Sequence, residues 1–350
     1  MAGVWSFHCN IKGLESMSKR KNPSGANNQN ADFCDFLIEL SEYEKNVTRN
    51  IHKFNAYRKA AGVLAAYHKR IESGDEAKKL EGIGEKISKK IDEFLQTGKL
   101  RKLEDIHQDG QAKAINLLTR VSGIGPVKAA ELVKSGITSI DGLRLHLDKL
   151  NHHQIIGLKY FEDFEKKIPR SEIQEIERKL REIILDLDTE FTVTICGSYR
   201  RGKAESGDID VLVTRPSLKV SEGKKKRGET LLKSIVEQLK ESLVTDVISI
   251  GDTKFMGVCR LSSEFPYRRL DIRLIPCEQY HCAVLYFTGS DVFNKTMRAH
   301  ALEQGFTLNE YSLRPVGVTG VPGEMIPIAS EQEIFEYINY PYKNPEERNM

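Results

Sequence analysis

The sequence has little net charge and no long apolar run. Its 53 lysines and arginines nearly balance its 50 aspartates and glutamates, which leaves a formal net charge of +3. Because so small an overall charge does not attract nucleic acid by itself, any nucleic-acid binding must depend on local clusters of residues. No apolar run approaches the ~20 residues that a membrane-spanning helix needs. We therefore expect a soluble protein without a membrane partner.

Cysteine pairs with metal-binding or redox spacing are also missing. The chain has 6 cysteines and no Cys-x-x-Cys, which is typical of a reduced intracellular protein. Cys277, His281 and Cys282 lie close together in sequence, but a fourth ligand and the usual zinc-site spacing are missing. Roles in packing or at the surface are therefore favoured over a zinc site.

The N-terminal residues lack the features of a targeting peptide. Residues 1–16 have neither the long apolar core of a secretory signal nor the arginines of a transit peptide, and Met17 resembles a second start. We expect residues 1–26 to form a disordered extension. The basic run Lys19-Arg20-Lys21 is either a solvated tail or a signal for nuclear import.

The sequence does contain enough apolar residues for more than one core. A chain of 350 residues that is 39% hydrophobic should form two or more compact units. From about residue 32 to residue 103 the apolar residues recur at helical spacing, as in the stripe Phe33, Phe36, Leu37 and Leu40. This pattern predicts an all-helical N-terminal unit.

A short glycine pattern occurs twice. The segment Leu80–Ile87 returns as Val121–Lys128, with an apolar residue, any residue, glycine, isoleucine and glycine in register. The pattern resembles the helix-hairpin-helix motif, in which glycines let the backbone approach a DNA phosphate and the next helix directs its N–H groups at the anion. One copy is equally well explained as a helix end, whereas two copies favour DNA binding that ignores base sequence. The glycines concerned are Gly82, Gly84, Gly123 and Gly125.

The most informative segment runs from Cys196 to Asp210. A short β-branched strand precedes Gly197-Ser198, whose tight turn exposes N–H groups that can hold a polyphosphate. Asp208 and Asp210 then open an apolar strand and, being two residues apart, project from one face. Neighbouring carboxylates repel each other unless a cation neutralises them, and hard oxygen ligands suit Mg²⁺ or Mn²⁺.

A third acid lies in a later strand. Residues 269–275 alternate, with Asp271 and Arg273 on the face opposite the apolar residues. If this strand pairs beside the Asp208 strand, the three acids converge on a two-metal site. A Gly-Asp-x-Asp segment alone is also a common surface turn, and only the joint pattern favours the metal site.

Together these motifs resemble the nucleotidyltransferase superfamily and, within it, the family X DNA polymerases. The resemblance extends from about Met17 to the C-terminus and includes both hairpins, the acid trio and the segment Tyr286–Asp291. It implies an α+β fold with a helical N-terminal region, a mixed-sheet palm and a small α/β C-terminal subdomain. The expected domains are a lyase domain at 27–105, a hairpin DNA-binding subdomain at 106–168, a palm at 169–276 and a nucleotide-selecting subdomain at 277–350.

The resemblance implies a gap-filling DNA polymerase of base excision repair. Two Mg²⁺ ions, for which Mn²⁺ can substitute, would be held by Asp208, Asp210 and Asp271, with Asp271 as the route for the primer's proton. Arg298 would contact the template strand. Lys167 stands where the family has an arginine, so it keeps the charge and loses bidentate geometry. The implied nucleotide contacts are Lys167, Ser198, Arg201, Gly207, Asp208, Tyr286, Phe287, Gly289, Asp291 and Asn294.

A second activity is implied for the N-terminal unit. Lys90 matches the lysine that forms a Schiff base with 5′-deoxyribose phosphate, which requires an amine that is neutral near pH 7, although an isolated lysine has a pKa of about 10.4. Lys89 stands where the family has an acid, and its charge is expected either to favour the neutral amine or to disturb a hydrogen-bonded partner of Lys90. A lysine cluster on a helix is otherwise usually a solvated face. The implied 5′-phosphate contacts are Lys53, Tyr57, Lys86 and Lys102.

The resemblance also implies further ligands and partners. K⁺ or Na⁺ would bind backbone carbonyls in each hairpin, because carbonyl oxygens suit such ions. We expect a nuclear monomer that binds gapped or nicked DNA with a 5′-phosphate, deoxynucleoside triphosphates and repair proteins of unspecified identity. The carbonyls concerned are those of Lys78, Leu80, Ile83, Thr119, Val121 and Ile124.

Two other functions remain open from the residues. One is an enzyme of the wider superfamily that adds nucleotides to RNA ends or small molecules. The other is a non-catalytic DNA-binding scaffold. The paired hairpins and Tyr286–Asp291 disfavour the first, and the intact acid trio disfavours the second.

Overall fold

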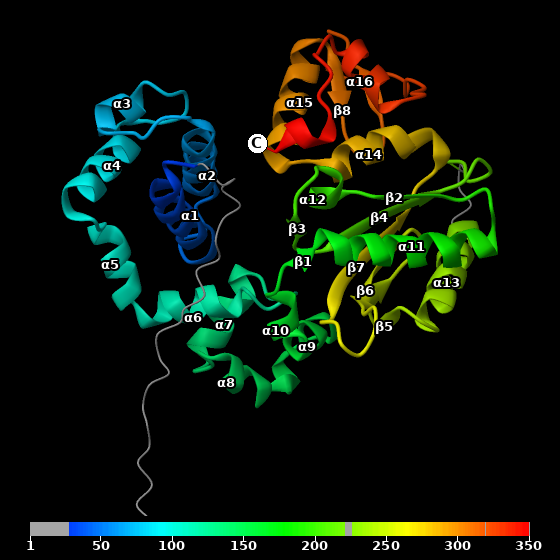
Figure 1. Ribbon diagram of the computed structural model, residues 1–350, viewed down its shortest axis with the longest axis horizontal. Helices are drawn as coiled ribbons and strands as arrows, with labels where there is room; N and C mark the ends of the chain where they lie inside the picture. The colour runs from blue at the N-terminus through cyan, green and yellow to red at the C-terminus, as the bar shows by residue number, and fades with distance from the viewer. Residues whose placement is uncertain (1–27, 221–225, 319, 350) are drawn as a thin grey trace, which may run out of the picture. The chain divides into compact units, whose positions relative to one another are not determined.

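The computed structural model describes residues 28–220, 226–318 and 320–349, and the chain divides into two compact units after Gln108 (Figure 1). The predictions made for residues 1–26, including the basic run at 19–21, lie outside the described residues. No helix in the described ranges is both long enough and apolar enough to cross a membrane.

The first unit is helical, as the apolar spacing predicts. Asn50 and Ser73 cap the second and third helices by accepting hydrogen bonds from the backbone N–H groups of Lys53 and Glu76. Phe33, Phe36, Leu37 and Leu40 are all buried, and rings of Phe33 and Phe36 lie edge-on or tilted against Phe94. The helices are α1 (Ala31–Asn46), α2 (Ile51–Ala66), α3 (Gly74–Lys78), α4 (Glu85–Thr97) and α5 (Arg101–Gln108).

The second unit begins with short helices that carry the second hairpin. Asn151 and Gln154 form a reciprocal capping box at the start of α9. This fixes the start of the helix that packs behind the hairpin. The elements are α6 (Gly110–Leu118), α7 (Pro126–Lys134), α8 (Ile140–Arg144), the 3₁₀ helix η1 (Leu147–Lys149), α9 (His152–Lys159) and α10 (Phe161–Phe164).

A mixed five-stranded sheet forms the palm. Its strand order is β2-β4-β7-β6-β5, with β4 and β7 parallel and the other pairs antiparallel. A two-stranded ribbon of β1 (Ile168–Pro169) and β3 (Glu205–Ser206) lies outside this sheet. The remaining elements are α11 (Arg170–Leu187), β2 (Thr192–Ile195), α12 (Gly197–Arg200), β4 (Ile209–Thr214), α13 (Lys226–Lys240), β5 (Val244–Ile250), β6 (Lys254–Cys259) and β7 (Arg268–Leu274).

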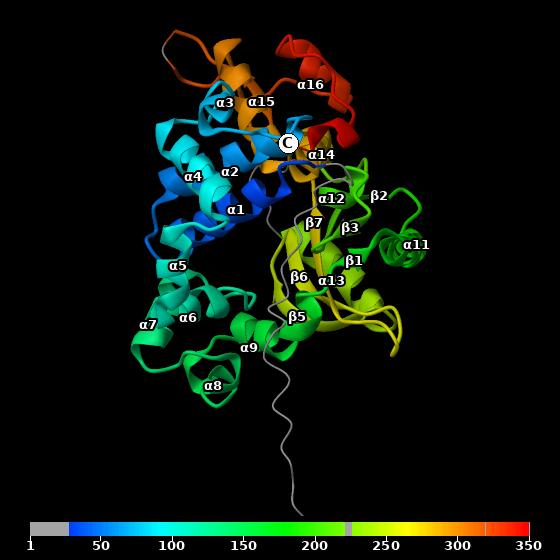
Figure 2. The same cartoon turned by 60° about the vertical axis from the view of Figure 1, so that its left-hand side comes forward.

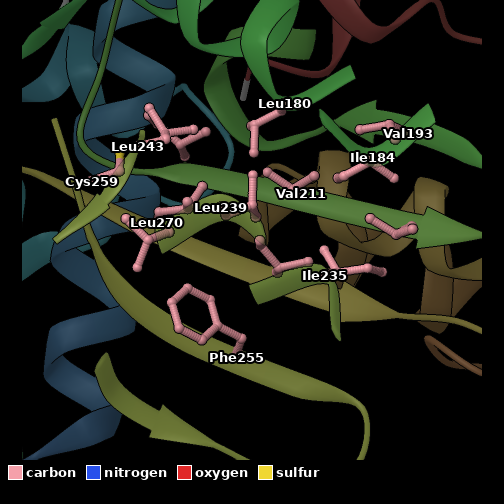
Figure 3. Close-up of a cluster of buried hydrophobic side chains, with 14 of the residues drawn as sticks. Leu180, Ile184, Val193, Val211, Ile235, Leu239, Leu243, Phe255, Cys259 and Leu270 are labelled. Carbon is pink, nitrogen blue, oxygen red and sulfur yellow. The ribbon is translucent and has the colours of Figure 1, made fainter. Parts of the chain in front are cut away.

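The two faces of the sheet have different coverings. On one face α11 and α13 pack their apolar side chains, including Leu180, Ile184 and Ile235, against the strands (Figure 3). Leu212 of β4 points to the other face, where it belongs to a separate apolar cluster with Ala283 and Val284 of α14. Because side chains two apart share a face, Asp210 lies on the side of Leu212.

The C-terminal segment continues from α14, which lies beside α12 (Figure 2) and also contacts β4. Phe293, Met297 and Phe335 form its core. Glu331 joins the buried Arg348 to Arg200 of α12, which ties this segment to the palm. The elements are η2 (Cys277–Gln279), α14 (Tyr280–Thr288), α15 (Asp291–Glu303), β8 (Phe306–Leu308), β9 (Leu313–Pro315), α16 (Glu331–Tyr337) and η3 (Pro345–Arg348). The predicted α+β fold is confirmed.

Candidate active sites and hairpins

The strands bring the acid trio to one place in the sheet. Asp208 comes directly before β4, Asp210 is the second residue of β4, and Asp271 is the fourth residue of β7. In the parallel β4–β7 ladder, the Cα partner of Asp210 is Asp271. The prediction that the Asp271 strand pairs beside the Asp208 strand is therefore confirmed.

The electrostatics of Asp208 and Asp210 fit a cation-binding pair. Burial, followed by repulsion from Asp208 and Asp271, raises the pKa of Asp210 to about 7. The pKa of Asp208 is also raised, first because neighbouring atoms displace water from its carboxylate and then because of the charge of Asp271. Part of the Asp208 side chain nevertheless reaches solvent. No cation forms an ion pair with either carboxylate in the described part of the chain. Two hard oxygen donors that repel each other in this way are the ligand type that Mg²⁺ or Mn²⁺ would stabilise.

The third carboxylate is occupied by an arginine. Arg269 Nη2 donates to Asp271 Oδ1 at 2.7 Å, and both side chains are only 16% exposed. Within the described ranges no three carboxylate, imidazole or thiol groups lie close enough together to hold a metal ion. The strands therefore meet as expected, while the three carboxylates do not form a three-ligand group and Asp271 is paired with Arg269 instead. That Asp208, Asp210 and Asp271 hold metal ions stays a prediction.

The predicted phosphate contacts lie around the start of β4. A Cβ atom added to Gly207 would lie 3.7 Å from Lys167 Nζ, and the charge of Lys167 opposes the rise in the Asp208 pKa. Lys167, Gly207 and Asp208 are therefore neighbours. Gly197 begins α12 with a positive φ of 59°, as the tight turn requires, and Ser198 Oγ donates to Ser206 Oγ at 2.8 Å.

Arg201 is already engaged within the protein. Its Nη1 donates to the backbone oxygen of Thr288 at 2.6 Å, and its Nε donates to Asn349 Oδ1 at 3.0 Å. Burial lowers the pKa of Arg201. To hold a triphosphate, this guanidinium would have to exchange these neutral acceptors for phosphate oxygens, which are stronger acceptors of charged hydrogen bonds.

The predicted sugar and base contacts lie where α14 ends and α15 begins. Asn294 Nδ2 donates to the backbone oxygen of Tyr286 at 2.7 Å, and the Arg298 guanidinium lies 4.9 Å from the centre of the Tyr286 ring. Gly289 has a positive φ of 65°, and α15 begins at Asp291. Tyr286, Asn294 and Arg298 line one small hollow.

One basic residue near this segment was not among the predicted contacts. The Arg273 guanidinium lies 4.4 Å from the centre of the Phe287 ring, and its charge opposes the rise in the Asp210 pKa. Arg269, Asp271 and Arg273 lie on the same face of β7. The period-two pattern that identified Asp271 could therefore also have placed both arginines beside it.

The two hairpins share one backbone geometry. Gly82 and Gly123 have positive φ values of 93° and 88°, which other residues rarely adopt. Gly84 and Gly125 are the N-caps of α4 and α7, make no side-chain cap, and have no heavy atom within 4 Å of an added Cβ. Each hairpin therefore presents uncapped N–H groups behind an open approach, as a phosphate contact requires.

The carbonyls predicted to hold monovalent cations follow the same repeat. Leu80 O accepts from Ile83 N at 3.2 Å, and Val121 O accepts from Ile124 N at 3.0 Å. Each carbonyl oxygen has a second lone pair, so these turns do not prevent cation binding. The carbonyls of Lys78 and Thr119 come from the residues at the ends of α3 and α6. The cation sites stay a prediction.

In the first unit Lys90 lies half-buried on α4. Burial first, then the charges of Lys102 and Lys86, lower its pKa, while Glu93 and Glu44 act in the opposite direction. A lowered pKa is what a lysine nucleophile needs near neutral pH. The surroundings of Lys90 therefore suit the predicted Schiff-base chemistry.

The effect of Lys89 on Lys90 stays a prediction. Lys89 is exposed, and its Nζ pairs with Glu85 Oε1 at 3.3 Å one turn earlier. The neighbouring lysines that lower the Lys90 pKa are Lys102 and Lys86. Residues one apart on a helix point in different directions, so Lys89 and Lys90 have different surroundings.

The predicted 5′-phosphate residues surround a buried acid. Lys102 Nζ donates to Glu44 Oε1 at 2.5 Å, and Lys53 Nζ lies 3.7 Å from Glu44 Oε2. The Lys102 ammonium also lies 6.0 Å from the centre of the Tyr57 ring. Lys86 is exposed on α4. Glu44, whose side chain is 0% exposed, was not predicted, because its partner Lys102 is 58 residues away.

Comparison with known families covers most of the chain. The DNA polymerase beta palm matches residues 167–277, and the DNA polymerase beta thumb matches residues 283–349. A helix-hairpin-helix domain matches residues 28–100, and the fingers domain of DNA polymerase lambda matches residues 116–165.

Curated relatives agree with these matches. DNA polymerase lambda of Rattus norvegicus is 34% identical over 335 residues, which cover 93% of this chain and 57% of the relative. DNA polymerase lambda of Arabidopsis thaliana is 34% identical over 312 residues, covering 84% and 58%. DNA-directed DNA/RNA polymerase mu of Homo sapiens is 24% identical over 346 residues, covering 91% and 68%. The chain therefore spans little more than half the length of the two lambda relatives.

Proposed function

Because the chain belongs to the family X DNA polymerases, we propose that it fills short gaps in DNA by template-directed addition of deoxynucleotides to a primer 3′-hydroxyl. The observation that carries this proposal is the placement of Asp210 and Asp271 opposite each other on parallel strands, with Asp208 and Lys167 beside them. Here repelling carboxylates adjoin a lysine and a glycine turn suited to phosphate.

The acids of the palm would act through divalent cations. Bound to Asp208, Asp210 and Asp271, two Mg²⁺ ions would lower the pKa of the primer 3′-hydroxyl and neutralise charge on the pyrophosphate. Asp271 would accept the proton of the 3′-hydroxyl once its carboxylate is released from Arg269. Asp208 and Asp210 would supply the other carboxylates that hold the cations in place.

Other residues would bind and check the nucleotide. Lys167, Ser198, Arg201 and the backbone at Gly207 would hold the triphosphate through charged or short hydrogen bonds. Tyr286, Phe287 and Gly289 would crowd the 2′ position of the sugar and so select deoxyribonucleotides. Asp291 and Asn294 would contact the base, and Arg298 would contact the template strand.

We also propose a 5′-deoxyribose phosphate (AP) lyase activity in the first unit. The neutral amine of Lys90 would attack C1′ of the open sugar and lose water to form a Schiff base. Loss of a C2′ proton would then break the C3′–O bond and release the DNA 5′-phosphate, and water would later regenerate the lysine. Lys53, Tyr57, Lys86 and Lys102 would hold the 5′-phosphate. The lowered Lys90 pKa and the cations around Glu44 support this proposal.

Within the family, the order of the hairpins, the acid trio and Tyr286–Asp291 resembles DNA polymerase beta. We therefore propose a role in base excision repair, on gapped or nicked DNA with a 5′-phosphate, in the nucleus, by a monomer that works with other repair proteins. Repair of this kind needs both a 5′-end activity and a synthesis activity, and one chain carries candidate residues for each.

Primer extension tests the proposed function. The full chain is offered gapped DNA with a 5′-phosphate or single-stranded RNA, with the four deoxynucleotides or ribonucleotides, with and without Mg²⁺. We expect Mg²⁺-dependent insertion of the complementary deoxynucleotide into the gap. Untemplated addition to RNA would instead indicate an end-adding enzyme. Tight DNA binding without extension would indicate a non-catalytic scaffold.

A further inference from the structure

A serine of the second hairpin is joined to the proposed metal site by one arginine. Ser122 lies between Val121 and Gly123, and Arg269 Nη1 donates to its Oγ at 2.8 Å. The other terminal nitrogen of Arg269 donates to Asp271 Oδ1 at 2.7 Å. The partly buried Arg269 guanidinium therefore contacts both the second hairpin, at Ser122, and Asp271, the acid that is not grouped with Asp208 and Asp210.

The position of Ser122 is itself fixed. Its Oγ lies 3.1 Å from His153 Nε2, and because arginine can only donate, the serine proton is available to the imidazole. Burial and the charge of Arg269 lower the His153 pKa, which favours the neutral ring that can accept this proton. A Cβ atom at Gly157 would lie 2.1 Å from Ser122 O, so α9 packs directly against this turn.

Arg269 is incompletely satisfied in this arrangement. Its Nε is buried and has no hydrogen-bond partner in the described part of the chain. A buried donor without an acceptor is unfavourable, so the arrangement depends on the two contacts that the side chain does make. A guanidinium that is already oriented by one hydrogen bond loses less side-chain entropy when it forms the second.

We propose that Ser122 is a positioning residue for the polymerase site: it orients Arg269 for the ion pair with Asp271 and so keeps that carboxylate from joining Asp208 and Asp210 around a divalent cation. The inference rests on the proposed function in one respect, that Asp271 is a metal ligand. Removing the Ser122 hydroxyl weakens the Arg269–Asp271 pair, releases Asp271 and strengthens cation binding.

Two substitutions of equal shape test the hydroxyl. Ser122→Thr keeps it and Ser122→Val replaces it with a methyl group, so the two side chains differ in hydrogen bonding and hardly in volume. Gln154→Ala is the matched control, because the Gln154 side chain donates to Gly123 O at 3.0 Å and holds the same turn without touching Arg269. Circular dichroism and thermal unfolding identify any variant that does not fold.

The probe is Mn²⁺ alone, added to the full chain without DNA or nucleotide and followed by the electron paramagnetic resonance signal of the free ion. Ser122→Val is expected to lower the dissociation constant for Mn²⁺ by about threefold to tenfold. This is the size of effect expected when the hydrogen bond from Arg269 to Ser122 is lost and the Arg269–Asp271 pair is weakened with it. Ser122→Thr and Gln154→Ala are expected to bind Mn²⁺ as the unaltered protein does. Equal or weaker binding by Ser122→Val, or equal strengthening by Gln154→Ala, would overturn the proposal.

A further variant separates this proposal from the proposed function. Asp210→Asn is expected to abolish the Mn²⁺ site, and if it leaves Mn²⁺ binding unchanged, the metal assignment and the role of Ser122 both fail. If Asp210→Asn abolishes binding while Ser122→Val changes nothing, only the role of Ser122 fails. With gapped DNA, Ser122→Val is also expected to lower the Mg²⁺ concentration for half-maximal extension by about the same factor, with kcat near its unaltered value.

Discussion

The two hairpins have the same backbone and different connections. At the position after the first apolar residue, one hairpin has Glu81, which pairs on the surface with Lys59 at 2.9 Å, and the other has Ser122, which contacts Arg269. A Cβ atom at Gly82 would meet Lys59, whereas one at Gly123 would meet His153. The repeated motif therefore predicts the backbone geometry that both hairpins share. Whether a hairpin is also linked to a candidate catalytic site depends on one side chain, Glu81 or Ser122.

The chemistry beside each hairpin also differs. The first hairpin leads into α4, whose Lys90 carries the proposed lyase, and the second is linked through Arg269 to the proposed polymerase site. If the two chemistries are separate, each can be removed without the other.

Asp271→Ala should give the largest effect. Loss of a carboxylate that holds the cation and accepts the proton is expected to lower gap filling by at least about 10³-fold. Affinity for gapped DNA should hardly change, because the hairpin backbones are intact. Primer extension and fluorescence anisotropy with gapped DNA measure the two quantities. Retention of synthesis would show that Asp271 does not belong to the site, and loss of Schiff-base trapping would show that the two chemistries are not separate.

Lys90→Ala should give the reverse result. Removal of the amine nucleophile is expected to abolish borohydride trapping of a 5′-deoxyribose phosphate substrate and to leave gap filling unchanged. Lys89→Ala is the matched control, because Lys89 is exposed and pairs with Glu85. Trapping at the unaltered yield in Lys90→Ala, or its loss in Lys89→Ala, would place the nucleophile elsewhere.

Alanine substitutions of the hairpin glycines should separate folding from DNA binding. Gly123→Ala forces a non-glycine residue to a φ of 88° and brings a Cβ atom to 2.9 Å from the His153 ring. It is expected to lower the free energy of unfolding by about 1–2 kcal/mol or more. Gly125→Ala, where φ is −88° and space is open, should leave stability nearly unchanged and weaken DNA binding. Denaturant unfolding and DNA titration give the two readouts, and unchanged DNA affinity in Gly125→Ala would contradict the phosphate contact.

Lys102→Gln should shift the pH dependence of the lyase. Lys102 is the charged group with the largest effect in lowering the Lys90 pKa, so its loss raises that pKa and reduces the neutral amine at pH 7. The midpoint of borohydride trapping against pH is expected to move to higher pH. Lys89→Gln should leave the midpoint unchanged. A shift to lower pH in Lys102→Gln would contradict the assigned electrostatics.

Much of the fold and of the candidate sites followed from local patterns. Helical spacing predicted the buried face of α1, period-two alternation predicted β7, and the glycine repeat predicted two similar hairpin turns, at Gly82 and Gly123. Each of these features depends on residues that are near in sequence. Local periodicity therefore sufficed for them.

The connections between distant segments did not follow. Ser122 and Arg269 are 147 residues apart, and no periodicity tells which hairpin residue a strand arginine will meet. Alternation predicted the face of β7 on which Asp271 lies. It did not predict the orientation of the Asp271 carboxylate, which depends on its attraction to Arg269 and its repulsion by the other acids. Glu44 was missed for the same reason, since its charge is explained only by lysines brought to it by folding.

Insertion of one nucleotide into a single-nucleotide gap, by the unaltered chain and by Asp210→Asn, tests the central claim most directly. With Mg²⁺, the unaltered chain should insert the complementary deoxynucleotide, and removal of Mg²⁺ by a chelator should stop insertion until the metal is restored. Asp210→Asn should show no insertion at any Mg²⁺ concentration while still binding the gapped DNA. Insertion by Asp210→Asn at the unaltered rate, or insertion that persists without divalent cations, would contradict the account.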